Sequence, residues 1–363
     1  MRHRDRHRGK AGTHTRESPA RTSVAEELLI DVLPELAGDR VACTTLGQAQ
    51  FALACATRLT ATQVVCQFFD LHFATEAHGR WINPPSNLEL RCEPDLPLAD
   101  SFDVVALPLR TEGEAEFARD LIQQGHQALR IGGRMAVAAK NPRDTWLNDE
   151  LRKLFAKVTR RPTSEGVVYL ATKTEPLRKL KNFDCEFAFR DGQRLIRLVS
   201  RPGVFSHREL DGGARTLIKA MDIRAGMRVL DIGCGSGAVG IAAALRTENV
   251  NVVCIDSHTR AIECTARGAA LNGVAGLTTM LSADGNVADP ASFDLALGNP
   301  PYFGDHAIAE LFLQSAHRAL KPSGHILIVT KSPAWYVTRM PELFLDVQVH
   351  ASKEFAVVEG IRE

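Results

Sequence analysis

The sequence predicts an α/β fold with two tandem doubly wound domains, whose sheets are mainly parallel and end in a C-terminal antiparallel hairpin. The chain has 363 residues and 45% apolar content, enough to bury two cores. In its second half, apolar runs of strand length alternate with helix-like stretches, which is typical of a parallel sheet covered on both faces. Segments of the first half also recur in the second half at a nearly constant spacing.

This internal repeat consists of three pairs of segments. Residues 39–54 align without gaps to 227–242, at an offset of 188. At an offset of 191, residues 101–106 align to 292–297, and 126–140 align to 317–331. Because the offset barely changes along the chain, we expect two copies of one fold with similar element spacing.

The second copy has the clearer pattern of elements. Its predicted strands are 228–232, 250–255, 278–282, 293–297 and 325–330. Its predicted helices are 238–246, 258–271 and 307–320, and residues 344–352 and 354–361 are expected to form the closing hairpin. In such a domain the ligand lies at the carboxyl ends of the strands.

Charge is unevenly distributed along the chain. Residues 1–21 contain seven Lys or Arg against two acidic residues, or +5, so a net charge of +1 leaves −4 for the rest. A basic arm that buries no apolar surface is predicted to be disordered. It could hold RNA phosphates or be a passive tail. Residues 174–204 are expected to be a basic linker with short strands at 185–190 and 194–200.

Several classes of protein and site are disfavoured by composition. No run approaches the roughly 18 apolar residues of a membrane span, and the N-terminus lacks a signal core. The eight cysteines include no CxxC pair and no Cys/His cluster with zinc spacing. We therefore expect a cytoplasmic protein with reduced thiols, without a membrane association or a metal.

A glycine-rich loop follows the first strand of the second copy. Gly233, Gly235 and Gly237 come just before the predicted helix at 238–246. Glycine permits unusual backbone dihedrals and lets the backbone approach a ligand, while the helix N-terminus offers N–H groups to an anionic group. The pattern also fits a nicotinamide dehydrogenase, because a lone loop of this kind is weak evidence.

Three acidic residues lie at successive strand ends. Asp231 precedes the first glycine and suits a cationic methionine amino group or sulfonium better than a pyrophosphate. Asp256 is placed to accept from two ribose hydroxyls, and Asp284 from an adenine amino group. Each could instead cap a turn, but their order behind the loop favours a site for S-adenosyl-L-methionine.

The motif Asn299-Pro300-Pro301-Tyr302 follows the fourth strand, 62 positions after the glycine loop. An aromatic amine is a poor nucleophile, because its lone pair is delocalised. The Asn299 side-chain oxygen and the Pro300 carbonyl could accept its two N–H groups and aim that lone pair, with prolines holding the backbone. Tyr302 could stack on the base. The motif therefore predicts methyl transfer onto an exocyclic amino group.

The first copy lacks these groups. Cys43 stands opposite Asp231, while Thr45, Gly47 and Ala49 stand opposite the three glycines, and residues 108–111 replace the Asn-Pro-Pro-Tyr motif. This copy should fold alike without catalysing, and could present substrate or add stability. The expected division is a disordered tail 1–22, a degenerate domain 23–173, a linker 174–204 and a catalytic domain 205–363.

The chain resembles the bacterial ribosomal RNA guanine-N2 methyltransferases, which pair a degenerate and an active class I methyltransferase (Rossmann-like) domain. The similarity covers most of residues 25–363. The matching segments are 140–141, 202–206, 210–211, 231–237 and 299–302. The resemblance implies that Phe205 and Asp211 border the cofactor pocket. It also implies that the target is a guanine amino group in ribosomal RNA or a ribosomal subunit.

Other functions remain open from sequence. Release-factor glutamine methyltransferases are similar around Asn-Pro-Pro-Tyr, but they carry a small helical domain instead of a second α/β sheet. Adenine-N6 methylation of nucleic acid would use the same chemistry at Asn299. A vestigial RNA-binding assembly factor is the non-enzyme alternative. We expect a monomer or a weak homo-oligomer.

Overall fold

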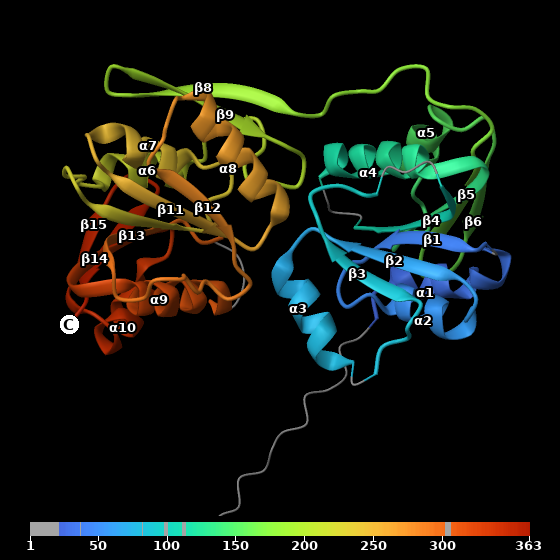
Figure 1. The fold of residues 1–363 in the computed structure, drawn as a ribbon, viewed down its shortest axis with the longest axis horizontal. Coiled ribbons are helices and arrows are strands. Elements are labelled where there is room, and N and C mark those ends of the chain that lie inside the picture. The colour runs from blue at the N-terminus through green and yellow to red at the C-terminus, as the bar shows by residue number, and fades with distance from the viewer. Residues whose placement is uncertain (1–21, 37, 82, 98–100, 111–113, 302–305) are drawn as a thin grey trace, which may run out of the picture.

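The computed structural model describes residues 22–36, 38–81, 83–97, 101–110, 114–301 and 306–363. They form two lobes side by side, each built on a seven-stranded sheet (Figure 1). We call the lobe with strands β1–β7 the first lobe and the lobe with β10–β16 the second lobe. The predicted fold class is confirmed. The predicted disordered tail falls almost wholly outside the described residues.

The sheet of the first lobe has the strand order β3-β2-β1-β4-β5-β7-β6. The strands are β1 (Arg40–Thr44), β2 (Gln63–Phe68), β3 (Leu88–Cys92), β4 (Phe102–Leu109), β5 (Leu129–Ala139), β6 (Val158–Pro162) and β7 (Val167–Thr172). The first five are parallel to one another, while β6 and β7 pair antiparallel.

The second lobe repeats this topology in the order β12-β11-β10-β13-β14-β16-β15. The strands are β10 (Arg228–Ile232), β11 (Asn251–Asp256), β12 (Leu277–Leu281), β13 (Phe293–Gly298), β14 (Leu320–Thr330), β15 (Leu345–Ala351) and β16 (Ala356–Ile361). The predicted C-terminal hairpin is present as antiparallel β15 and β16. The strand predicted at 325–330 begins earlier, because Leu320 already pairs with Phe293 before a register shift.

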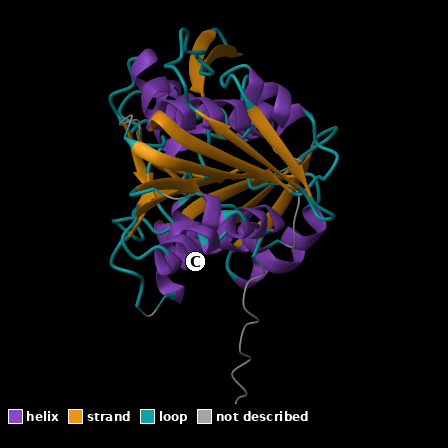
Figure 2. Ribbon diagram, turned by 90° about the vertical axis from the view of Figure 1, so that its right-hand side faces the viewer, coloured by secondary structure: helices purple, strands orange, loops and turns teal. Residues whose placement is uncertain are grey.

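Helices cover both faces of each sheet, so the strands lie between two helical layers (Figure 2). In the first lobe they are α1 (Val24–Asp31), α2 (Gln50–Arg58), α3 (Leu71–Arg80), α4 (Ala115–Ala128) and α5 (Trp146–Arg152), with η1 (Leu33–Glu35). In the second lobe they are α6 (Gly212–Ala220), α7 (Ala238–Arg246), α8 (Thr259–Leu271), α9 (Ala307–Ala319) and α10 (Pro333–Arg339), with η2 (Met340–Glu342). The apolar faces of these helices bury each sheet on both sides.

A two-stranded hairpin, β8 (Cys185–Asp191) and β9 (Arg194–Ser200), connects the lobes and agrees with the predicted linker strands. Ile196 and Leu198 of β9 are fully buried against the second lobe. In Figure 1 this hairpin lies over α8 of the second lobe. The basic linker is therefore partly integrated into that lobe's core.

The lobes meet about an approximate two-fold axis at the ends of β2 and β11. The Leu71 N–H donates to the Ser257 carbonyl and the Thr259 N–H donates to the Phe69 carbonyl, both at 2.8 Å. The repeat offset of 188 relates the two hydrogen bonds, because Leu71 corresponds to Thr259 and Phe69 corresponds to Ser257. Asp70 and His258, which form an antiparallel bridge, are likewise equivalent positions. The duplication seen in sequence thus appears as symmetry in space.

Arg260 joins the lobes through a fully buried side chain with 0% exposure. Its guanidinium lies 2.7 Å from Asp120 and 3.4 Å from Asp95. It also lies over the rings of Phe69 and Phe117, 5.0 and 5.1 Å from their centroids. Both carboxylates and both rings belong to the first lobe, so this arginine of α8 fixes the relative position of the lobes.

Candidate functional site

The glycine loop connects β10 to α7 at the carboxyl edge of the second sheet. Gly233 and Gly237 have φ of 69° and 79°, in a backbone region that residues with a Cβ rarely adopt. A Cβ on Gly233 would lie 2.5 Å from Phe312, and one on Gly237 would lie 2.8 Å from Thr265. Both positions require glycine, which lets the loop turn tightly into the N-terminus of α7.

Asp231 lies beneath this loop and is only 3% exposed. Its Oδ2 accepts a 2.8 Å hydrogen bond from the Gly240 N–H, which holds the first turn of α7 against β10. Burial raises the pKa of this carboxyl to about 7, and the charge of Asp256 adds to the effect. Asp231 does not belong to the cavity wall described below, so its predicted contact with a cationic ligand stays a prediction.

Asp256 ends β11 and does line the cavity. Its Oδ2 accepts from the Gly235 N–H at 2.9 Å and its Oδ1 from the His258 N–H at 2.8 Å. Burial raises its pKa to about 6 despite these two bonds, and the charge of Asp70 contributes. The carboxylate is therefore held rigidly beside the glycine loop, where a ligand's hydroxyl groups could reach it.

Asp284 is exposed and lies in a turn after β12. Its carboxylate accepts from the backbone and side-chain nitrogens of Asn286, which is the turn-capping alternative. The neighbouring Ser282, Ala283 and Gly285 line the cavity instead. The predicted contact of Asp284 with an adenine amino group remains a prediction.

Asn299 follows β13 and lines the same cavity as Gly233 and Gly235. Its Nδ2 donates a 2.9 Å hydrogen bond to Asp211 Oδ2, so the acceptor end of the amide is its Oδ1. Asp211 also caps α6 by accepting from the Ala214 N–H at 3.0 Å. A helix cap thus orients the asparagine.

The remaining predicted residues divide between the cavity and its surroundings. Pro301 lines the cavity, whereas Pro300 is buried and is not part of the cavity wall. Phe205 lines the cavity from the segment before α6, with 49% of its surface exposed. Asp211 lies outside the cavity wall but contacts Asn299, and Tyr302 lies outside the described residues.

The cavity has a volume of about 600 Å³ and lies where the two lobes meet. The glycine loop and the Asn-Pro-Pro segment, 62 positions apart, both open into it. Its walls also include residues of the first lobe that the sequence analysis missed, namely Asp70, His72, Phe73 and Arg110. In the sequence, the internal repeat is the signal that bears on them, because it makes Asp70 the equivalent of His258, which lies across the axis.

His258 also lines this cavity. Its Nδ1 is buried with no hydrogen-bond partner among the described residues. Burial lowers the pKa of this imidazole to about 4, so it is neutral near pH 7. A neutral imidazole with an unpaired nitrogen can donate to or accept from a bound ligand.

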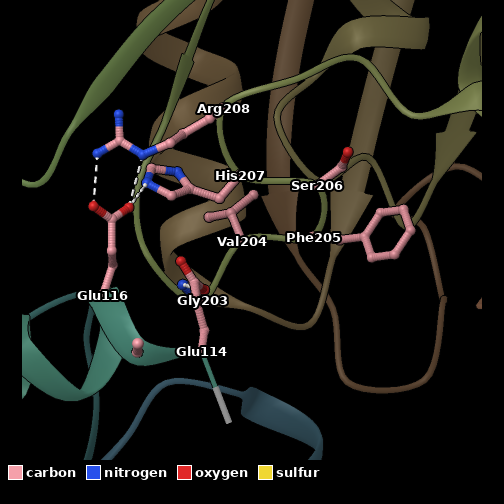
Figure 3. A pocket seen from close by; sticks show the side chains of 9 residues that line it. Glu114, Glu116, Gly203, Val204, Phe205, Ser206, His207 and Arg208 are labelled. Carbon is pink, nitrogen blue, oxygen red and sulfur yellow. Dashed lines mark hydrogen bonds and ion pairs between the residues drawn. The ribbon is translucent and has the colours of Figure 1, made fainter.

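A second contact between the lobes borders the cavity (Figure 3). Arg208 donates to both oxygens of Glu116 at 2.7 and 2.9 Å, and His207 Nε2 lies 3.2 Å from the same carboxylate. The Gly203 N–H donates to Glu114 at 2.7 Å. Glu114, Glu116 and His207 are close enough to share a metal ion, but the arginine already neutralises Glu116. We interpret this cluster as a contact that holds the 203–208 segment.

The first lobe keeps the backbone of the site but carries different side chains at its key positions. The strand registers place Cys43 beside Cys66 as Asp231 lies beside Cys254, so Phe68 occupies the position of Asp256. Ala49 is the N-cap residue of α2 with φ of 58°, just as Gly237 is the N-cap residue of α7 with φ of 79°. Pro108 stands at the position of Asn299.

Comparisons with known proteins agree with this geometry. Residues 195–359 match the family model "Methyltransferase small domain". A "Ribosomal RNA small subunit methyltransferase C" from Pseudoalteromonas atlantica is 32% identical over 157 residues, 42% of this chain and 45% of the relative. One from Haemophilus influenzae is 30% identical over 191 residues, 51% and 57% of the two chains. The chain thus spans about half the length of the curated relatives it matches.

A solved structure extends the likeness to both lobes. It is described as a T. thermophilus 16S rRNA N2 G1207 methyltransferase in complex with AdoMet and guanosine. It superposes with a TM-score of 0.77 over 93% of this chain and 92% of its own, at 21% identity. The resemblance predicted from sequence is confirmed. Residues 195–359 match a methyltransferase small domain, and the chain has the two-lobed fold of that structure.

Proposed function

We propose that this protein transfers a methyl group from S-adenosyl-L-methionine to the guanine N2 amino group of ribosomal RNA. One observation carries the proposal: the glycine loop and Asn299 line a single cavity. The family match and the relatives' names support the reaction class and the ribosomal substrate. Such a substrate would place the protein in the cytoplasm, with ribosomal RNA or a ribosomal subunit as its partner.

The residues around the glycine loop fit the proposed methyl donor. The backbone of the glycine loop allows close approach, and Asp256 faces the cavity as an acceptor for ribose hydroxyls. Asp231, beneath the loop, would favour a cationic ligand nearby. When bound, this cofactor supplies a methyl group already activated by its sulfonium. None of the described helices has the length and apolar character needed to cross a membrane.

The substrate amine would be held by Asn299 and the backbone beside it. The bond to Asp211 turns the amide so that Oδ1 can accept one N–H, and the Pro300 carbonyl can accept the other. Two such acceptors draw the nitrogen toward tetrahedral geometry and aim its lone pair. Catalysis then rests on placement, with no obligatory general base.

Labelled S-adenosyl-L-methionine tests the proposal directly. The protein is incubated separately with ribosomal RNA, each ribosomal subunit, release factor and DNA, and the modified atom is identified. We expect N2-methylguanine in RNA, lost in Asn299→Ala and retained in Asn251→Ala, an exposed asparagine at the far end of β11. Label on a glutamine or an adenine would assign one of the alternative substrates. Binding of RNA without any transfer would favour an assembly factor.

A further inference from the structure

The first lobe has a second cavity of about 560 Å³, which the proposed reaction does not use. It lies at the carboxyl ends of β1, β2 and β4, in the position that the candidate active cavity holds in the second lobe. The two cavities adjoin, because five residues line both of them. These shared residues are Asp70, Phe73, Arg110, Gly203 and His258.

This second cavity is unsuited to the methyl donor. Phe68, 3% exposed, replaces the Asp256 carboxylate, and Cys43 replaces Asp231. The carboxylates in its wall are already engaged: Asp70 accepts from the Ser257 hydroxyl at 2.9 Å, and Glu114 accepts from the Gly203 N–H at 2.7 Å. Neither is positioned as Asp256 is in the second lobe.

The same wall offers what a nucleotide needs. Phe69, Phe73 and Phe117 line it, and Phe73 is 42% exposed. Thr44 is 4% exposed, and its Oγ1 has no partner among the described residues. A buried unpaired hydroxyl is costly unless a ligand completes it. Thr44 occupies the position of Ile232 in the second lobe, so this polar group is peculiar to the degenerate copy.

We propose that this cavity receives the base of a second nucleotide of the RNA strand, adjacent in space to the target guanine. The inference rests on the proposed function. Phe73 stacks on the base, the Thr44 hydroxyl bonds its edge, and the exposed Arg110 between the cavities pairs with the phosphate backbone. The degenerate lobe then selects the target by its neighbour while the other lobe reacts with it.

Filling the cavity tests this assignment. Gly47 lines only the second cavity, and a Cβ there would meet nothing closer than Gln50 Oε1 at 4.0 Å, so Gly47→Leu should fold. The matched control is Gly79→Leu, at an exposed glycine of α3 with open space around it. A third variant, Thr44→Val, removes the unpaired hydroxyl at nearly constant volume.

The measurements are the KM and kcat for a small-subunit ribosomal RNA fragment that the wild-type protein methylates, and the donor Kd by calorimetry. We expect Gly47→Leu to raise the KM for RNA about tenfold, the scale of one lost base stack. Thr44→Val should raise it about threefold without lowering the thermal unfolding midpoint. The kcat, the donor Kd and all values for Gly79→Leu should stay within about twofold of wild type.

The other outcomes reject either the second nucleotide site or the proposed function. An unchanged KM in both Gly47→Leu and Thr44→Val rejects the second nucleotide site while leaving RNA methylation intact. Should Gly47→Leu unfold, Thr44→Val decides alone. Two moles of donor bound per mole of protein, reduced to one by Gly47→Leu, would assign a second cofactor site instead. Failure of the wild-type protein to methylate any RNA would reject the proposed function itself.

Discussion

The two lobes share one strand order but differ at the carboxyl edge of the sheet. In the second lobe, Asp256 and Asn299 face a cavity beside a glycine loop. In the first lobe, Phe68 and Pro108 hold the equivalent positions. Buried apolar strands need only general packing, whereas a site needs particular groups. The two lobes can therefore share one scaffold while they differ at the residues of the site.

A substitution at the interface between the lobes should have the largest effect. We expect Arg260→Ala to lower the free energy of unfolding by about 3–5 kcal/mol, because it leaves Asp120 without its buried arginine partner and Asp95 with Arg201 alone. Arg267→Ala, at a partly exposed pair with Asp184, should cost at most about 1 kcal/mol. Urea unfolding of both variants measures the difference. Equal effects would mean that the lobes do not depend on this contact.

Removing the amide tests whether chemistry belongs to one lobe. Asn299→Ala should lower kcat at least about 100-fold, roughly 2.7 kcal/mol of activation free energy, because the amine loses an acceptor and its orientation. The donor Kd should stay unchanged in calorimetry. Pro108→Ala, at the equivalent position of the first lobe, is the control and should keep near-normal kcat. A large loss of kcat in that control would place catalysis in both lobes.

The paired residues Gly237 and Ala49 compare the two loops directly. Gly237→Ala should destabilise by about 1–2 kcal/mol and weaken donor binding, because of its positive φ and the close Thr265 side chain. Ala49→Gly relieves a similar backbone strain but loses a buried methyl group, so its net effect should stay within about 1 kcal/mol. Thermal unfolding and donor titration measure both. A Gly237→Ala variant as stable as the wild type, with unchanged donor binding, would show that both loops tolerate a Cβ.

The smallest effect is a pH dependence confined to the second lobe. The pKa of Asp256, raised to about 6, means that its carboxylate is present above that pH and is lost below it. We expect donor affinity to fall about tenfold from pH 7 to pH 5. The effect of Asp256 on stability has the opposite direction to its effect on donor affinity. Because its pKa is higher in the folded state, the folded state binds the proton more tightly, and this group raises the stability of the fold as pH falls through 6.

Asp256→Asn isolates that contribution. Its donor affinity should be weaker at pH 7 and nearly flat from pH 6.5 to pH 5. Asp231, whose pKa lies near 7, would account for any dependence that persists above this range. An undiminished decline below pH 6 in Asp256→Asn would assign the titration to another group.

Much of the fold and part of the site could be predicted from sequence. The strand beginning at Arg228, the hairpin of β15 and β16 and the division into two sheets follow from local periodicity and from the repeat. The glycine loop and Asn299 were expected at one sheet edge, because parallel strands bring their carboxyl ends together. These features depend on spacing along the chain.

Other features required the packed lobes. Asp70, Phe73 and Arg110 belong to the candidate site because of the approximate two-fold axis, which no local pattern encodes. The orientation of the Asn299 amide depends on Asp211, 88 positions earlier. The sequence by itself determined the elements, the duplication and the reactive motif. Only the tertiary structure decided which side chains face the candidate active cavity, because packing of the two lobes brings together groups that are distant in the chain.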